Sequence, residues 1–313
     1  MPQDKLISII LPVQNEEKNI PLVYKEISKV ITKLPYRFEF IFINDGSRDK
    51  SLDTLQKLRK KDPSVTIIDF TRNFGKEIAT TAGINNCKGD ACIILDADLQ
   101  HPPKLIPQFI KKWEKGSDIV IGIRKTNKNE GKVKMIGSFV FYKIMNQISG
   151  NSITPRATDF MLIDRQAIDE FNKFSERNRL TRGLVEWLGF DKEFIYYNAR
   201  ERIHGKAAYS ITKLIRLAIN SIVSLTYFPL KLVGYFGSII TILSAVVGII
   251  LFVEEYILHD KFHWYINGTA ILATMIIFLV GIILMSLGLI TLYIANIHVE
   301  AIKRPLYIIK KRS

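Results

Sequence analysis

The strongest constraint on how this chain can fold lies in its C-terminal third, where two long segments carry no charged residue. Leu232 to Val253 is a run of 22 residues and Gly268 to Ile297 is a run of 30 residues, and both are largely apolar. Because an α-helix rises about 1.5 Å per residue, either run could cross the roughly 30 Å hydrocarbon core of a bilayer. A pair of buried core helices is the alternative. The lengths favour two transmembrane helices, over about 232–253 and 269–294.

The charges that flank these two segments predict their orientation. The short loop between them carries three acidic residues and one lysine, Lys261, whereas the tail over residues 298–313 carries five basic residues. Cytoplasmic segments of membrane proteins are enriched in Lys and Arg. The N-terminus does not have the layout of a signal peptide. We therefore expect a multi-pass protein of a bacterial-type inner (plasma) membrane, with the loop outside and with the N-terminal domain and the basic tail in the cytoplasm.

Residues 211–230, which precede the first apolar run, combine basic and aliphatic residues. Lys213 and Arg216 lie three positions apart among isoleucines and leucines, and Pro229 comes near the end of the segment. This pattern predicts an amphipathic helix that rests on the inner leaflet and ends at the proline.

Residues 1–210 alternate between apolar runs and amphipathic segments. The alternation predicts an α/β domain built on a parallel sheet. Near-continuous apolar runs indicate strands that are covered on both faces. The expected strands are Leu6–Val13, Phe38–Ile43, Val65–Phe70, Ala91–Leu95 and Asp118–Ile123. Helices are expected at about 17–33, 50–61, 75–87, 103–115 and 131–149.

The composition narrows the class of partner. Lys and Arg number 44 and Asp and Glu number 30, so the net charge is +14. Such a surplus suits nucleic acid, anionic lipid or phosphate-bearing substrates. Two membrane segments argue against nucleic acid as the partner and favour membrane lipid. Cys87 and Cys92 have no metal-binding spacing and are expected to be buried free thiols.

Polar clusters follow four of the expected strands. In an open parallel sheet, ligands bind beyond the carboxyl ends of the strands, so these clusters would share one edge. Isolated helix caps use the same residue types, but four clusters at one edge are harder to explain as caps. The clusters are Pro12 with Asn15 and Glu16, Asn44–Ser47, Arg72–Lys76, and Asp96–Pro103, which includes His101.

The pair Asp96 and Asp98 is the most informative of these features. Two carboxylates two residues apart leave an extended strand on the same side. They predict a site for Mg²⁺ or Mn²⁺, a hard ion that also takes phosphate oxygens and can neutralise a departing diphosphate. A capped turn before Pro102 is the structural alternative.

Taken together, these motifs resemble inverting glycosyltransferases of family 2. The resemblance is strongest to the dolichol-phosphate mannose synthase branch, and within it to bacterial polyprenyl-phosphate glycosyltransferases with two C-terminal spans. It covers nearly the whole chain, including the tail segment Glu300–Tyr307. It implies a GT-A (Rossmann-like) nucleotide-sugar-binding domain, interfacial helices and two transmembrane helices.

The resemblance also implies roles for individual residues. Pro12, Glu16 and Asp45 would hold the nucleotide base and ribose, and Asp96, Asp98 and Gln100 would hold the metal. Asp159 matches the position proposed as a catalytic base in relatives, and Arg202 matches a basic loop that closes over the phosphates. We include Asn15, Arg72, Lys76 and Ala97 as substrate-binding candidates because they belong to the same clusters.

The expected acceptor qualifies the role of Asp159. A lipid monophosphate has a second pKa near ~6, so at neutral pH it is already a competent nucleophile and depends less on a general base. Asp159 could instead orient the sugar or a basic residue. Arg124, Lys134, Arg202 and Lys206 are expected to hold the two phosphates together, with Asp98, Asp159 and Arg202 as the catalytic candidates.

The sequence departs from the family pattern at four positions. Gln14 replaces a common aromatic residue, Met161 a common arginine and Ala207 a usual serine, while Lys134 stands near the place of an arginine. The last two bear on contacts to the acceptor and leave the expected reaction class unchanged.

The resemblance therefore predicts inverting transfer of a hexose, with glucose or N-acetylglucosamine favoured, from a nucleotide diphosphate sugar to polyprenyl (undecaprenyl) phosphate at the cytoplasmic face. The donor is expected to be a UDP-sugar, the product a lipid-linked donor for cell-envelope glycosylation, and the assembly a homo-oligomer. Two alternatives are a processive polysaccharide synthase, whose Gln-x-x-Arg-Trp motif the sequence lacks, and an inactive membrane-tethered protein that only binds sugar nucleotides.

Overall fold

The computed structural model describes residues 5–125, 154, 156–177, 179–198 and 268–310, with single positions at 235, 239, 246 and 253. The chain divides into two compact units, one comprising Met1–Tyr209 with Arg304–Ser313 and the other comprising Ser210–Lys303. The helices expected at 131–149 and 211–230, and nearly all of the first expected span at 232–253, lie outside the described residues.

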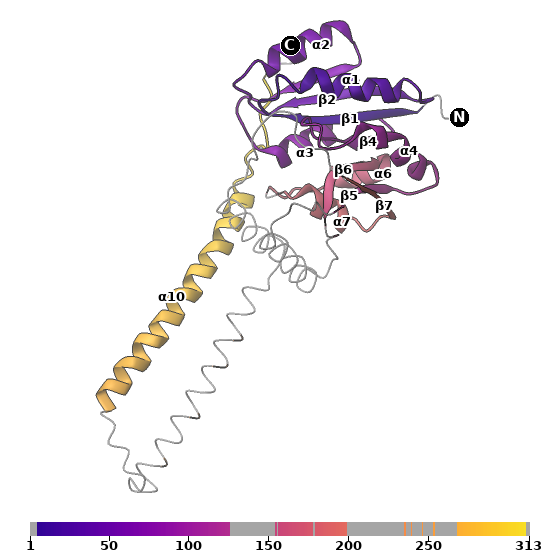
Figure 1. The fold of residues 1–313 in the computed structure, drawn as a ribbon. Helices are drawn as coiled ribbons and strands as arrows, with labels where there is room; N and C mark the ends of the chain where they lie inside the picture. The colour runs from indigo at the N-terminus through magenta and orange to yellow at the C-terminus, as the bar shows by residue number, and fades with distance from the viewer. Residues whose placement is uncertain are drawn as a thin grey trace. The chain divides into compact units, whose positions relative to one another are not determined.

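The first unit is built on a seven-stranded sheet in the order β3-β2-β1-β4-β6-β5-β7 (Figure 1). Six strands run in the same direction, and β6 runs antiparallel between β4 and β5. The expectation of a wholly parallel sheet is therefore wrong at one strand. The strands are β1 Leu6–Val13, β2 Arg37–Asn44, β3 Val65–Asp69, β4 Ala91–Ile94, β5 Ile119–Arg124, β6 Ala157–Asp164 and β7 Lys192–Tyr197.

The apolar runs of the central strands are explained by burial on both faces of the sheet. Along β1, Ile9 and Leu11 belong to one core while Ile10 belongs to the other. All three side chains are fully buried. A strand covered on both sides needs apolar residues at successive positions, and for this reason β1 and β2 were predictable to within a residue.

Helices cover the two faces of the sheet, which makes three layers (Figure 1). Helices α1 and α4 contribute buried residues to the first core, and α3, α6 and α7 contribute to the second. Their apolar residues recur every three or four positions, as in Ile20, Val23 and Ile27 of α1. The helices are α1 Ile20–Ile31, α2 Ser51–Lys61, α3 Lys76–Asn86, α4 Ile106–Glu114, α6 Arg165–Phe171 and α7 Thr181–Trp187, with a 3-10 turn over Pro103–Leu105.

The described part of the second unit is dominated by one long helix, α10, which spans Gly268–Ala301 and contains 34 residues. It covers the second apolar run of the sequence and exposes many apolar side chains, such as Leu272 and Ile283. Among the residues that the structure describes, no helix is both long enough and apolar enough to cross a membrane.

Candidate active site

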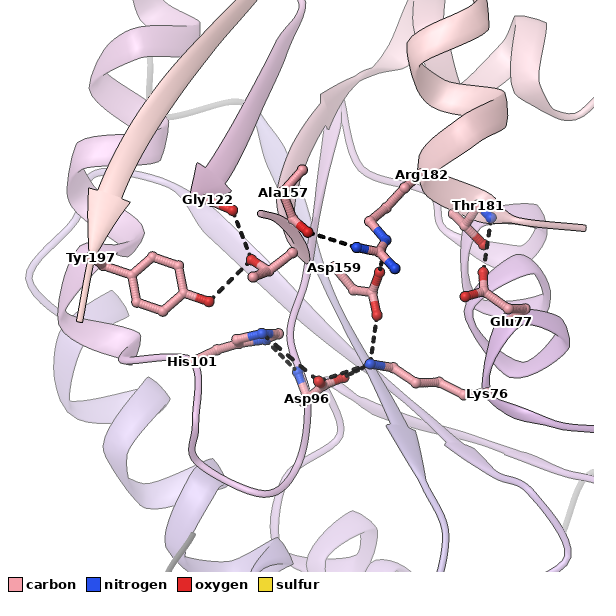
Figure 2. A network of polar contacts seen from close by, with 11 residues as sticks. Lys76, Glu77, Asp96, His101, Gly122, Ala157, Asp159, Thr181, Arg182 and Tyr197 are labelled. Carbon is pink, nitrogen blue, oxygen red and sulfur yellow. Dashed lines mark hydrogen bonds and ion pairs between the residues drawn. The ribbon is translucent and has the colours of Figure 1, made fainter. Parts of the chain in front are cut away.

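Four charged side chains from different parts of the first unit meet where β4 ends (Figure 2). Lys76, the first residue of α3, places its Nζ atom 2.6 Å from an oxygen of Asp96 and 2.6 Å from Asp159 Oδ2. Arg182 of α7 places its Nε atom 3.0 Å from the other oxygen of Asp159. Asp96 follows β4 and Asp159 lies in β6, so the antiparallel strand brings the second carboxylate to this edge of the sheet. The cluster therefore depends on the one strand whose direction was not expected.

The charges in this cluster hold one another in their ionised forms. Burial alone would lower the pKa of Lys76, but the carboxylates of Asp96 and Asp159 outweigh burial and raise this pKa above its ordinary value. Burial alone would raise the pKa of Asp159, but Lys76 and Arg182 together lower it below its ordinary value. Lys76 and Asp159 are thus held in their charged forms, as an ammonium and a carboxylate that face each other.

His101 supports Asp96 from the other side. Its Nδ1 atom accepts a hydrogen bond from the backbone N–H of Asp96 at 3.1 Å, and its ring stacks on Phe160 with centroids 5.3 Å apart. Burial lowers the pKa of His101, despite the neighbouring Asp96. Because Nδ1 accepts this hydrogen bond, His101 fixes the turn that carries Asp96.

A set of uncharged contacts positions β6 around Asp159. Thr158 donates to the carbonyl of Gly122 at 2.8 Å and accepts from the Tyr197 hydroxyl at 3.0 Å. Arg182 also donates through Nη1 to the carbonyl of Ala157 at 2.6 Å. Two neighbours of Asp159 in the sequence are thus fixed by β5, β7 and α7, and this limits the positions that its carboxylate can take (Figure 2).

Asp45 links two of the polar clusters. Its carboxylate is buried and accepts from the backbone N–H groups of Phe74 and Gly75, at 2.6 and 3.0 Å. Burial raises the pKa of Asp45, and these backbone hydrogen bonds oppose the rise. Gly46 next to it has φ +59°, and a Cβ there would lie 2.4 Å from the backbone of Arg72. The loop over residues 72–75 is therefore packed directly onto Asp45 and Gly46.

The loop after β1 is held by side chains from the loop after β2. Asn15, at φ 56°, donates from its backbone N–H to Ser47 Oγ at 3.0 Å and accepts from the backbone N–H of Arg48 at 2.8 Å. The backbone N–H of Glu16 donates to Ser51 Oγ at 2.9 Å. Pro12 pairs with Ile43 within the sheet. Asn15, Glu16 and Asp45 thus lie on adjacent loops, as the sequence predicts.

Asp96 and Asp98 do not lie on an extended strand, contrary to expectation. The chain turns after β4, Leu99 takes a left-handed conformation at φ 64°, and Asp98 accepts from the backbone N–H of Gln100 at 3.0 Å. Ala97 and Asp98 are both buried. The turn separates the environments of the two carboxylates, with Asp96 facing Lys76 and Asp98 capping its own turn.

The donor set of this turn bears on whether it could hold a divalent ion. In the part of the chain that the structure describes, no three His, Cys, Asp or Glu residues gather closely enough to hold a metal by themselves. Mg²⁺ commonly takes one or two carboxylates from a protein and its remaining ligands from phosphate and water. Asp96 and Asp98 supply carboxylate oxygens of the kind that such an ion takes, and the turn holds the two in different environments, Asp96 beside Lys76 and Asp98 on the backbone of Gln100.

The remaining predicted residues fall into two groups. Arg72 lies with its guanidinium 4.0 Å from the centre of the Phe74 ring, and Arg124 ends β5. Lys134, Arg202 and Lys206 lie outside the described residues, as do the other residues of the expected phosphate-closing loop. Sequence reasoning missed Arg182 because no unusual motif marks it. Its contact with Asp159 depends on how α7 packs against β6.

Comparisons with known proteins identify the family of this chain. The family model described as glycosyl transferase family 2 matches residues 8–171. The uncharacterized glycosyltransferase YkcC of Bacillus subtilis (strain 168) is 37% identical over 306 residues, covering 97% of this chain and 93% of that protein. The SfII prophage-derived bactoprenol glucosyl transferase of Shigella flexneri is 36% identical over 305 residues, covering 97% of both chains.

Solved structures support the fold independently. Glucosyl-3-phosphoglycerate synthase from Mycobacterium tuberculosis, crystallised with Mn²⁺, uridine diphosphate and phosphoglyceric acid, matches 71% of this chain and 77% of its own. The TM-score is 0.50 at 18% sequence identity. The α/β domain with its mixed seven-stranded sheet is thus GT-A-like. This chain is a glycosyltransferase, and it belongs to glycosyltransferase family 2.

Proposed function

We propose that this enzyme transfers a hexose from a nucleotide diphosphate sugar to bactoprenol (undecaprenyl) phosphate at the cytoplasmic face of the membrane. Glucose is the favoured sugar because relatives that match nearly the whole chain are named bactoprenol glucosyl transferases. N-acetylglucosamine is the second candidate, and UDP is the favoured nucleotide. The observation that carries the proposal is the paired cluster of Lys76, Asp96, Asp159 and Arg182 at the carboxyl edge of the sheet.

The reaction is a single displacement with inversion. An oxygen of the lipid phosphate forms a bond to the anomeric carbon of the sugar, and the bond from that carbon to the nucleotide diphosphate breaks. The bonding pair leaves with the diphosphate, so the products are a lipid phosphosugar and a nucleoside diphosphate. The chain must bring two anionic phosphates together, which requires cations at fixed positions.

Each side of the site has residues for one part of this task. Pro12 near the end of β1 and the adjacent loops that carry Glu16 and Asp45 would bind the nucleoside. Asp96 and Asp98, with Gln100, would hold Mg²⁺ or Mn²⁺, and a bound ion supplies positive charge for the departing diphosphate. Lys76 lies beside Asp96, so its ammonium also faces a phosphate that approaches the same edge.

The pairing of Asp159 favours an orienting role over that of a base. Its two oxygens contact Lys76 and Arg182, and its pKa is lowered, so accepting a proton would cost both ion pairs. The acceptor phosphate is ionised at neutral pH and does not require deprotonation. Asp159 therefore fixes the two cations that face the substrates.

The membrane placement is supported by sequence. The second uncharged run lies within one continuous helix of 34 residues, α10, and exposed apolar surface of this extent is typical of membrane contact. The basic tail after this helix and the acidic loop before it favour a cytoplasmic site for the reaction.

The decisive experiment gives the purified full-length protein undecaprenyl phosphate and a panel of UDP-glucose, UDP-N-acetylglucosamine and GDP-mannose. We expect a glycolipid from one UDP-sugar, with the sugar–phosphate bond inverted relative to the donor, as NMR of the product would show. Lys76→Met should abolish the product. Lys57 is an exposed lysine on α2, so the control variant Lys57→Met should keep full activity. Release of free sugar without glycolipid would reject the lipid acceptor, and binding without turnover would identify a sugar-nucleotide-binding protein.

A further inference from the structure

The segment that follows α10 is part of the catalytic unit and has no role in the mechanism above. Residues 304–313 cluster with Met1–Tyr209, and residues 304–310 are described. Strand β3 is the outermost strand at its end of the sheet. Ile309 forms an antiparallel bridge with Phe70, just beyond β3, so the segment extends the sheet at this edge.

Backbone hydrogen bonds fix the segment on both sides of this bridge. The backbone N–H of Thr71 donates to the carbonyl of Ile308 at 3.0 Å, and that of Lys310 donates to the carbonyl of Asp69 at 2.8 Å. On the opposite side, the backbone N–H of Phe70 donates to the carbonyl of Asn44 at 3.0 Å. The stretch Asp69–Thr71 is thus held between β2 and the C-terminal segment, directly before the loop over residues 72–75.

Side chains carry the connection further into the nucleotide loops. The ring of Tyr307 stacks on Phe70, with centroids 5.1 Å apart and planes at 19°. Phe70 contacts the Phe74 ring edge-on at 5.5 Å, and the backbone N–H of Phe74 donates to Asp45. A row of three aromatic rings therefore joins the C-terminal segment to the loop that Asp45 holds.

A second connection runs through Asp69. Lys310 Nζ lies 3.4 Å from Asp69 Oδ2, and the other oxygen of Asp69 accepts from the Asn44 side chain at 2.6 Å. Asn44 immediately precedes Asp45, and its side-chain oxygen accepts from the backbone N–H of Ser47 at 3.4 Å. The C-terminal segment thus reaches both the loop after β2 and the loop after β3.

We propose that the segment Arg304–Lys310 is a positioning element for nucleotide binding, with Tyr307 as its principal positioning residue. The proposal rests on the proposed function in taking these two loops as the nucleoside site. Without the Tyr307 ring, Phe70 and Phe74 lose the support of the outer edge, and the loop that carries Arg72 and Gly75 can move away from Asp45. The nucleotide should then bind more weakly, because the free protein must first order this loop.

The test compares Tyr307→Ala with Tyr307→Phe in the full-length protein. We expect Tyr307→Ala to raise the Kd for UDP and the KM for the donor about tenfold, as loss of a stacked aromatic pair and of loop order would do. The kcat and the KM for the lipid acceptor should stay within about twofold. Tyr307→Phe should keep the wild-type donor KM, since the contacts described for the hydroxyl, with Asn85 and Asn86, are both long at 3.5 Å.

Ile308→Ala is the matched control. Its side chain is exposed while its backbone carbonyl keeps the hydrogen bond from Thr71, so binding of UDP should not change.

Wild-type UDP affinity in Tyr307→Ala would overturn the proposal. A fall in kcat at unchanged donor KM would also overturn it, because that result indicates loss of folded enzyme. Calorimetry with UDP needs no acceptor, so a wild-type protein that binds UDP but makes no glycolipid would reject the proposed function and leave this test intact. If the wild type binds no UDP, hydrogen exchange at the Phe74 and Gly75 amides decides: wild-type rates in Tyr307→Ala overturn the proposal.

Discussion

Lys76 lies between two carboxylates that would repel each other at one edge of the sheet. Its ammonium contacts Asp96 and Asp159, which come from segments far apart in the sequence. In the proposed reaction, a substrate phosphate would meet a cation already in position, with no need to recruit one from solvent. Such preorganisation reduces the reorganisation that the reaction requires.

We expect metal removal to stop the reaction. Asp96→Asn and Asp98→Asn should each lower transfer by roughly 100-fold or more, since the departing diphosphate would lose much of the charge that stabilises it. EDTA should have the same effect on the wild type, and Mg²⁺ or Mn²⁺ should reverse it. Asp53→Asn on α2, an exposed carboxylate, is the control. Full transfer in EDTA would disprove the metal site.

The ion pairs of Asp159 should also appear in the dependence of stability on pH. The pKa of Asp159 is lowered from 3.8, so its stabilising contribution is complete above about pH 4 to 5 and is lost as the pH falls through the lowered value. Asp159→Asn should then reduce the free energy of unfolding at pH 7 by about 1–3 kcal/mol. Thermal melts should show this difference shrinking below pH 4. A difference that grows in acid would contradict the ion-pair assignment.

Close packing between α3 and the sheet sets the position of Lys76 at the start of that helix. Gly83 of α3 lies against β1, and a Cβ at this position would be 2.3 Å from Ile10 Cγ2. Ile10 is fully buried and cannot move aside easily. The helix therefore approaches the sheet more closely than any residue with a side chain would allow.

We predict that Gly83→Ala destabilises the protein by about 1–3 kcal/mol through overpacking. Gly183→Ala is a matched control on α7, because a Cβ there meets its nearest neighbour, Leu180, at an ordinary 3.5 Å. The control should be neutral or slightly stabilising, as alanine favours helix over glycine by about 1 kcal/mol. Denaturant unfolding of the two variants should separate these outcomes, and equal midpoints would refute the packing argument.

Strands β1 to β5 could be predicted from sequence because burial on both faces requires long apolar runs. The direction of β6 could not, since it follows from pairing with β4 and β5 and leaves no local signal in Ala157–Asp164. Strand β7 was missed because its residues alternate between exposed and buried.

Among site residues, Asp96 was predictable from its place after a strand. The ion pair between Arg182 and Asp159 was not predictable, because it depends on how α7 packs. The cysteines were predicted correctly as buried free thiols.

At the scale of the whole molecule, the proposed topology makes a prediction of its own. The loop over residues 254–267 should lie outside the cell and the C-terminal segment inside. Single cysteines introduced in the loop should react with an impermeant thiol reagent in intact cells, and cysteines at residues 304 or 313 should react only after lysis. Cys87 and Cys92 are buried, so their background labelling should be low. The reverse pattern would overturn the cytoplasmic placement of the site.

The pairing of the C-terminal segment with the edge of the sheet has a consequence for biosynthesis. Asn86 and Tyr307 are 221 residues apart in the chain, yet they are neighbours in the fold. Domains generally begin to fold while the ribosome is still elongating the chain, N-terminal part first. Here the outer edge of the sheet stays open until residues 304–310 have emerged, after both apolar segments have been translated. The loops after β2 and β3 thus gain their support from this segment only when the segments proposed to anchor the enzyme have already left the ribosome.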